Sequence, residues 1–189
     1  MTELRNILLI AGGGRNVGKT HLGCHVISTL AQQGILPVAI KVSGHFHQPG
    51  VNIKSIVKDE GLFIGEELNI NSNKDSSRFL QAGAKRSYYV QLSQNHLIRL
   101  VEFIKNSFSG DQPIIFESAG LGELVKPGIA FFVIKNNIEK KCSWKFKYFK
   151  INGFEPDNIP EWPVVKWINS GWLIESGSQM QYSYQTNYF

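Results

Sequence analysis

The chain has 189 residues, of which 42% are hydrophobic and 19% charged, with a formal net charge of +5. This length and composition predict one globular domain with a single substantial core. No apolar run approaches the roughly 18–20 residues of a membrane-spanning helix, and the first residues lack the layout of a signal peptide, so we expect a cytoplasmic protein with no membrane contact. Two cysteines, Cys24 and Cys142, are too few for a disulfide framework.

The first predicted element is an apolar strand, residues 7–11, followed by a glycine-rich loop and a helix. Residues 13–20 fit the pattern G-x-x-x-x-G-K-T, in which backbone N–H groups surround a phosphate and the next helix points its positive end at it. We therefore predict a nucleoside triphosphate site, with Lys19 at the β- and γ-phosphates and Thr20 on Mg²⁺. The residues of this segment expected at the nucleotide are Gly13, Gly14, Arg15, Asn16, Val17, Gly18, Lys19, Thr20 and His21.

The next elements predict a βαβ unit. Apolar residues recur at helical spacing over residues 22–30, and Gly34 supplies a stop signal for this helix. Cys24 falls on the helix, where we expect a small core residue. Residues 37–42 read as a buried second strand, reached by a right-handed crossover. Residues 43–75 are polar and aperiodic, which is typical of a functional or mobile segment.

Strands and helices continue to alternate in the middle of the chain. We expect helices over residues 75–83 and 95–107, and strands over residues 88–92, 113–117 and 129–134. Near-continuous apolar strands alternating with helices predict a three-layer α/β domain of the P-loop NTPase type, built around a mostly parallel sheet.

The C-terminal part of the chain predicts a β-rich extension. Aromatic residues alternate with lysines over residues 144–148, and residues 164–168 read as one more strand. We therefore divide the chain into a nucleotide-binding domain (residues 1–136), an extension packed on the same domain (residues 137–175) and a loosely ordered tail (residues 176–189).

Several polar residues follow predicted strands and are candidates for the second half of the site. Glu117 ends an apolar strand, where it would hold a water on Mg²⁺ or orient the attacking water, or form a plain salt bridge. Lys41 is either an anion or substrate contact or a solvated lysine. His45 and His47 are too few to form a metal site by themselves. They are either polar contacts to nucleotide or substrate, or part of a loop with no functional role. The candidate catalytic residues are Lys19 and Glu117.

Taken in order, these segments resemble the MobB-type molybdopterin-guanine dinucleotide biosynthesis adaptors. The matching segments are the loop at 13–20, Ile40-Lys41, His45-Phe46-His47, Lys74-Asp75-Ser76-Ser77-Arg78, Gln81-Ala82-Gly83-Ala84 and Ile115-Phe116-Glu117. The resemblance covers roughly residues 5–135. It departs from the family at Ser118, which stands where the family has glycine, and in a longer interval between His47 and Lys74.

The resemblance implies a P-loop GTP-binding protein of the class that includes dethiobiotin synthetase, acting as a homodimer with weak GTPase activity. It also implies a partner, the enzyme that joins GMP to molybdopterin. Asp75 then belongs to the nucleotide or metal site, so that the expected Mg²⁺ ligands are Thr20, Asp75 and Glu117. Ser76 is expected to cap the helix that follows.

Two other functions remain open. The same fold carries ATP-dependent small-molecule kinases and ligases, and in such an enzyme residues 43–75 would form the acceptor site. The chain has no Asn-Lys-x-Asp motif, so guanine specificity cannot be inferred from that motif.

A nucleic-acid-binding module is the third possibility, because residues 135–150 hold the whole net charge and aromatic residues are interleaved with their lysines. Alternation on a strand, however, places aromatics and lysines on opposite faces, as in an ordinary amphipathic strand.

Overall fold

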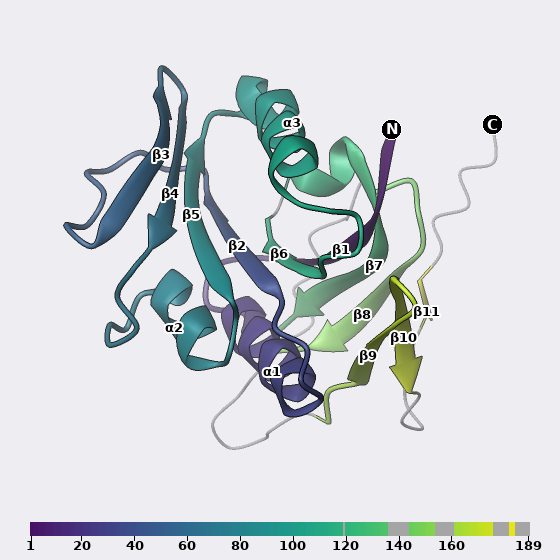
Figure 1. Ribbon diagram of the computed structural model, residues 1–189. Helices are drawn as coiled ribbons and strands as arrows, with labels where there is room; N and C mark the ends of the chain where they lie inside the picture. The colour runs from purple at the N-terminus through teal and green to yellow at the C-terminus, as the bar shows by residue number, and fades with distance from the viewer. Residues whose placement is uncertain (119, 136–143, 154–160, 176–181, 184–189) are drawn as a thin grey trace.

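The computed structural model describes residues 1–118, 120–135, 144–153, 161–175 and 182–183. In this part of the chain nine strands form one sheet and two more form a small separate sheet (Figure 1). The strands of the large sheet are β1 (Thr2–Gly12), β2 (Val38–Ser43), β3 (Ile53–Asp59), β4 (Leu62–Glu67), β5 (Arg86–Leu92), β6 (Ile114–Glu117), β7 (Val125–Ile134), β8 (Tyr148–Asn152) and β11 (Tyr182–Ser183). The small sheet is β9 (Val164–Ile168) and β10 (Gly171–Glu175), and the α-helices are α1 (Lys19–Gln32), α2 (Asp75–Gln81) and α3 (Leu97–Ser107).

The large sheet has the order β11-β8-β7-β1-β6-β2-β5-β4-β3. Its strands from β8 to β5 are parallel to their neighbours, whereas β3, β4 and β11 pair antiparallel at the edges. The prediction of an α/β fold around a mostly parallel sheet is confirmed. The chain passes from β1 through α1 to β2, and β6 later fills the place between those two strands. Open α/β sheets bind ligands at the carboxyl ends of strands beside such a crossover.

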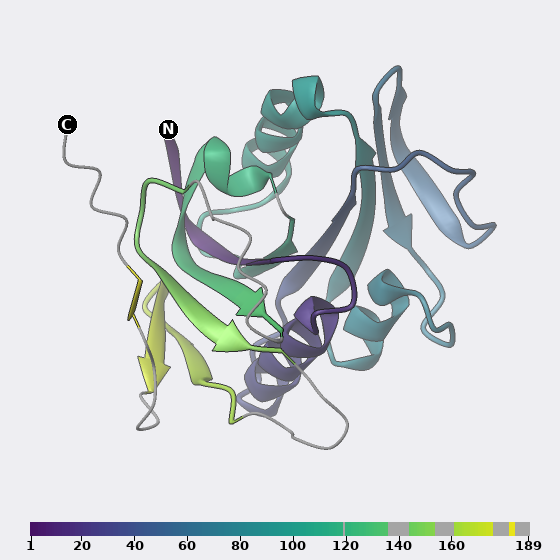
Figure 2. The same ribbon diagram turned by 180° about the vertical axis from the view of Figure 1, so that it is seen from behind.

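Helices cover both faces of the sheet. Alternate residues of β1 face opposite sides, because side chains of a strand alternate. Leu9 lies in a buried cluster with Leu100 of α3, and Ile10 lies in a second cluster with Leu22 of α1 and Phe79 of α2. Figures 1 and 2 accordingly show α3 on one side of the sheet and α1 with α2 on the other.

The sequence-based prediction of residues 43–75 as a continuous irregular segment is wrong. This segment contains β3 and β4, an antiparallel hairpin turned at Gly61. The hydrophobic pattern did not reveal β3 because the strand is mostly exposed and its pairing shifts between Ser55 and Val57. A half-exposed edge strand with an irregular register has no strict alternation of apolar and polar residues.

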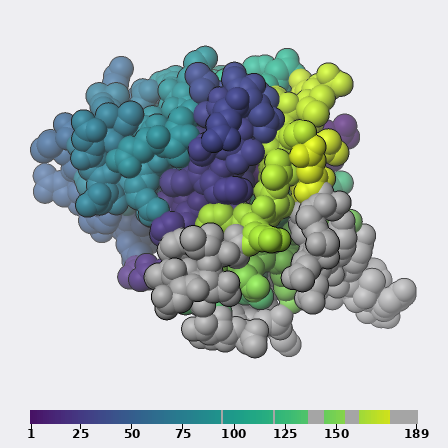
Figure 3. All heavy atoms as spheres, turned by 90° about the horizontal axis from the view of Figure 1, so that it is seen from below, coloured from purple at the N-terminus to yellow at the C-terminus, as the bar shows by residue number. Residues whose placement is uncertain are grey.

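The C-terminal elements differ in detail from expectation. The predicted strand at 164–168 coincides with β9, but its partner β10 was missed. The strand expected from Trp144 begins only at Tyr148, as β8, which pairs parallel with β7. The small sheet packs against α1, and Figure 3 shows the C-terminal strands running beside that helix.

Two expectations concern parts of the chain that are only partly described. Of the tail at 176–189, only residues 182–183 are described, as β11 beside β8; the remainder lies outside the described residues, as does Cys142. None of the helices in the described ranges combines the length and apolar character needed to cross a bilayer.

Candidate functional site

The glycine-rich loop joins β1 to α1 at the carboxyl edge of the sheet. Asn16 and Gly18 have left-handed backbone conformations, with φ of 57° and 97°, which wind the chain tightly before the helix. Gly18 is the N-cap of α1 and no side chain of the described residues caps this end, so the first N–H groups of the helix remain available to an anion. Lys19 Nζ donates a hydrogen bond to the Gly14 carbonyl across the loop. Burial lowers the pKa of Lys19, an effect that the charge of Glu117 opposes.

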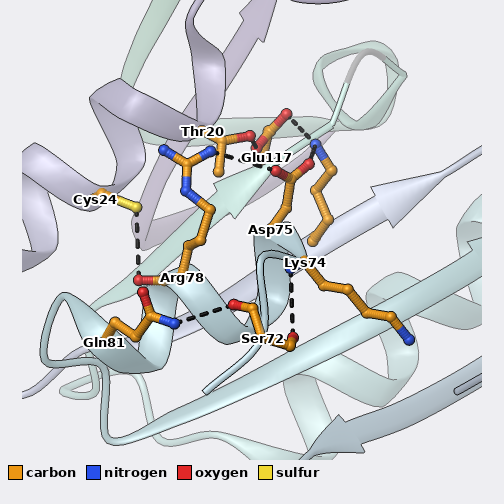
Figure 4. Close-up of polar contacts among 9 residues, drawn as sticks. Thr20, Cys24, Ser72, Lys74, Asp75, Arg78, Gln81 and Glu117 are labelled. Atoms are coloured by element: carbon orange, nitrogen blue, oxygen red, sulfur yellow. Dashed lines mark hydrogen bonds and ion pairs between the residues drawn. The ribbon is translucent and has the colours of Figure 1, made fainter. Parts of the chain in front are cut away.

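Glu117 and Lys41 face each other on neighbouring parallel strands. The register pairs Lys41 of β2 and Ile10 of β1 with Glu117 of β6. Side chains of paired residues lie on the same face of a sheet, and Ile10 faces α1 and α2. The side chains of Lys41 and Glu117 therefore also lie on the face that α1 and α2 cover. Thr20, in the first turn of α1, donates its Oγ1 hydrogen bond to Glu117 Oε2 at 2.9 Å (Figure 4). The Glu117 carboxylate is almost completely buried, with 2% of the residue exposed.

Asp75 completes this cluster from the first turn of α2. Its Oδ2 lies 2.8 Å from Lys41 Nζ, and the same ammonium bonds to Glu117 Oε1. Arg78 Nη1 lies 3.7 Å from Asp75 Oδ1. Burial alone would raise the pKa of Asp75 and lower that of Lys41. The opposite charges outweigh burial: Lys41 lowers the pKa of Asp75, and Glu117 together with Asp75 raises the pKa of Lys41. Both groups are therefore ionised at neutral pH.

The donor set suits a hard cation that arrives with phosphates. Thr20, Asp75 and Glu117 offer only oxygen atoms, which Mg²⁺ prefers. No group of three or more histidine, cysteine, aspartate and glutamate side chains in the described ranges forms a metal cluster. Protein sites for Mg²⁺ commonly supply one or two carboxylates and leave the other positions to phosphate and water. The three residues therefore fit Mg²⁺ as part of a phosphate complex.

A buried glutamate anchors the helix that carries Asp75. Glu67, at the end of β4, is 4% exposed; its carboxylate accepts hydrogen bonds from Ser76 Oγ and the Asn69 N–H, each 2.9 Å long. The expectation that Ser76 caps this helix is wrong, because Lys74 is the N-cap and Ser76 is already inside the first turn. Ser76 instead ties α2 to the sheet, which fixes the position of its neighbour Asp75.

The histidines lie around the cluster and do not converge. His21 is on the exposed side of the first turn of α1, where partial burial and the charge of Arg78 lower its pKa. His45 is exposed and bonds through its backbone to Ser43 Oγ. The His47 backbone exchanges two hydrogen bonds of 2.9 Å with the Gln91 amide, and its ring contacts Tyr89. The structure thus brings together Lys19, Thr20, Lys41, Asp75 and Glu117, and leaves His45 outside.

Some contacts of the site were missed from the sequence. Gly153, just after β8, packs so closely on the loop that a Cβ added there would lie 1.7 Å from the Val17 carbonyl oxygen. Arg78 was noted only as part of a motif, although its guanidinium faces Asp75. An i,i+3 acid–base pair at a helix start was the available signal for Arg78. No sequence pattern pointed to Gly153, because its contact depends on a parallel pairing far along the chain.

The described part of the basic stretch has its aromatic residues turned inward. Trp144 and Tyr148 are each 3% exposed and pack on Phe132, while Lys145 and Lys147 are exposed. Base stacking needs an accessible ring face, which these two aromatic residues do not offer. The arrangement agrees with an amphipathic segment.

Comparison with protein-family models, with curated proteins and with solved structures gives no match for this chain.

Proposed function

We propose that the protein is a P-loop nucleotide-binding protein that binds a nucleoside triphosphate with Mg²⁺ and hydrolyses it slowly. The observation that carries the proposal is that Thr20, Asp75 and Glu117 converge beside the loop of residues 13–20, although they come from three separate elements. A glycine-rich loop of this pattern is common by itself. Its combination with a hydroxyl and two carboxylates supports the proposal, because these are the oxygen ligands that a phosphate–Mg²⁺ pair needs.

Each residue has a role that follows from its position. The loop N–H groups and Lys19 bind the β- and γ-phosphates, and Thr20, Asp75 and Glu117 hold Mg²⁺ directly or through water. The metal, when bound, neutralises charge on the phosphate oxygens. Glu117 is also the group that can orient a water for attack, because its carboxylate ends β6 at the edge where the loop lies.

The resemblance to MobB-type adaptors extends this proposal to a nucleotide and a partner. On that basis GTP is the preferred nucleotide, the protein acts as a homodimer, and its partner is the nucleotidyltransferase that joins GMP to molybdopterin. Support comes from the segment 74–78, which follows the family pattern in sequence and places Asp75 beside Lys41 in the structure.

A second candidate, an ATP-dependent small-molecule kinase or ligase, is favoured by a cavity within the segment 43–75 that was expected to form the acceptor site. This cavity of about 660 Å³ lies between the loop after β2 and the β3–β4 hairpin. His47 lines it and also contacts Tyr89, whose backbone pairs with Lys41. An acceptor bound there would contact the loop that follows β2, the strand that carries Lys41. Phosphate transfer from ATP to a small acceptor would establish this candidate in place of the adaptor.

The phosphate role of Lys19 can be tested by Lys19→Ala, using Lys85→Ala as a control because Lys85 is an exposed lysine away from the site. Loss of a charged hydrogen-bond donor should weaken Mg²⁺–nucleotide binding by about tenfold to a hundredfold in titration calorimetry, and Lys85→Ala should bind as wild type. Equal affinity of Lys19→Ala and the wild type would remove the loop from the proposed site.

A further inference from the structure

The Lys41 ammonium lies between the two carboxylates of the site. Its Nζ is 2.8 Å from Asp75 Oδ2 and also bonds to Glu117 Oε1, so two of its three donors are used by the carboxylates. The three residues come from β2, α2 and β6, which makes the ammonium the bridge between three elements. The position between two carboxylates is also the one that a divalent cation with these ligands would take.

The bridge leaves little negative charge for a free metal ion. Glu117 Oε2 accepts the Thr20 hydroxyl and its Oε1 faces Lys41, so both oxygens of this buried carboxylate have partners. Arg78 adds a second positive charge beside Asp75. A divalent cation arriving without phosphates would have to displace the Lys41 ammonium from the carboxylates. The ammonium repels the cation and, as part of the chain, cannot diffuse away.

We propose that Lys41 is a resident counter-ion that excludes a divalent cation from Asp75 and Glu117 until the phosphates of a nucleotide give the ammonium another partner. This inference rests on the proposed function, because the phosphates are what release Lys41. The consequence is coupled binding, in which nucleotide and metal enter together and the nucleotide-free protein holds no tightly bound metal.

The proposal is tested by titrating nucleotide-free protein with Mn²⁺ as a probe for Mg²⁺ and following the loss of the free-ion electron paramagnetic resonance signal. Lys41→Met removes the charge but retains the length of the aliphatic chain, and should bind Mn²⁺ about tenfold or more tightly than wild type. Lys41→Arg keeps the charge and should bind as weakly as wild type. The double variant Lys41→Met/Asp75→Asn should lose the gain, because it removes one of the two carboxylates.

Equal Mn²⁺ affinity of Lys41→Met and wild type would overturn the proposal, as would a wild type that binds nucleotide without any increase in its affinity for Mn²⁺. Lys41→Met leaves Glu117 buried without its counter-ion, so the variant can lose its fold in metal-free buffer. In that case circular dichroism in the presence of Mn²⁺ gives the answer: recovery of structure supports the proposal, and no recovery contradicts it.

Failure of the proposed function gives a different result. If the wild type binds no nucleotide while Lys41→Met gains Mn²⁺ affinity, the nucleotide site is wrong and Lys41 is a counter-ion without a phosphate trigger. If the wild type binds nucleotide and Lys41→Met gains nothing, the function stands and the counter-ion role is wrong.

Discussion

Single residues of the site are held in their charged forms by one another. The pKa of Asp75 lies below its ordinary value and that of Lys41 above its ordinary value, despite burial that acts in the opposite direction on each. The pair therefore stabilises the fold across the neutral range. Its contribution is lost in acid as pH falls through the depressed pKa of Asp75, and in strong base as pH rises through the raised pKa of Lys41.

Cys24 gives a prediction at the residue scale. Its thiol is half-buried between α1 and α2, with Sγ 3.6 Å from the Arg78 carbonyl oxygen, and burial raises its pKa to about 11. At pH 8 native Cys24 should therefore react with iodoacetamide roughly a hundredfold more slowly than the same thiol in urea, because the thiolate is the reactive form. Cys142→Ser removes the second thiol, and mass spectrometry measures the rate. Similar rates in native and unfolded protein would show that Cys24 is not protected.

The candidate site could be predicted where its residues follow local rules. Thr20 lies in a sequence motif, and Lys41 and Glu117 were found because parallel strands present their carboxyl ends at one edge. The anchoring of Asp75 through Ser76 and Glu67 could not be predicted, because the same Asp-Ser sequence is equally suited to a plain helix cap. Local sequence preference could not distinguish a Ser76 that caps its own helix from one that hydrogen-bonds to Glu67 on a neighbouring strand.

At the scale of elements, predictions succeeded where burial leaves a clear apolar pattern in the sequence. The apolar stripe of α3, which includes Leu100, has helical spacing, whereas β1 and β6 appear as continuous apolar runs because both of their faces are buried. The strands β3 and β10 were missed because they are largely exposed and mix polar with apolar residues on both faces. β4 is mostly buried, but its apolar run covers only residues 62–64 before Gly65 and two glutamates. When both faces of a strand contact solvent, nothing requires apolar residues at every second position, so the strand leaves no hydrophobic period in the sequence.

The contact between the end of β8 and the glycine-rich loop gives a prediction at this scale. Gly153 is tightly packed against the Val17 carbonyl, a backbone atom that cannot move without moving the loop. Gly153→Ala should cost about 1–3 kcal/mol of unfolding free energy and weaken nucleotide binding. Gly110→Ala is the matched control, since a Cβ there meets no atom within 4 Å.

Urea unfolding and calorimetric titration measure the two effects. Wild-type stability and affinity in Gly153→Ala would mean that the end of β8 does not support the loop.

At the scale of the whole molecule, the site depends on the sheet order. Thr20 and Glu117 are 97 positions apart in the chain, yet their side chains are hydrogen-bonded because β6 inserts beside β1. The outer strands of the sheet, with β3 and β4 on one side and β8 and β11 on the other, flank this centre and differ most from the sequence-based expectation. The centre of the sheet holds the candidate site, and strands nearer its edges line the cavity and contact the glycine-rich loop.

The central claim is that the loop and the Thr20, Asp75 and Glu117 cluster form one site for a Mg²⁺–nucleoside triphosphate. Titration calorimetry of the wild type with GTP and with ATP, each with and without Mg²⁺, tests it most directly. We predict binding that Mg²⁺ tightens by about tenfold or more, because the cluster adds metal ligands to the phosphate contacts. Binding of neither nucleotide, or an affinity that Mg²⁺ does not change, would contradict the claim.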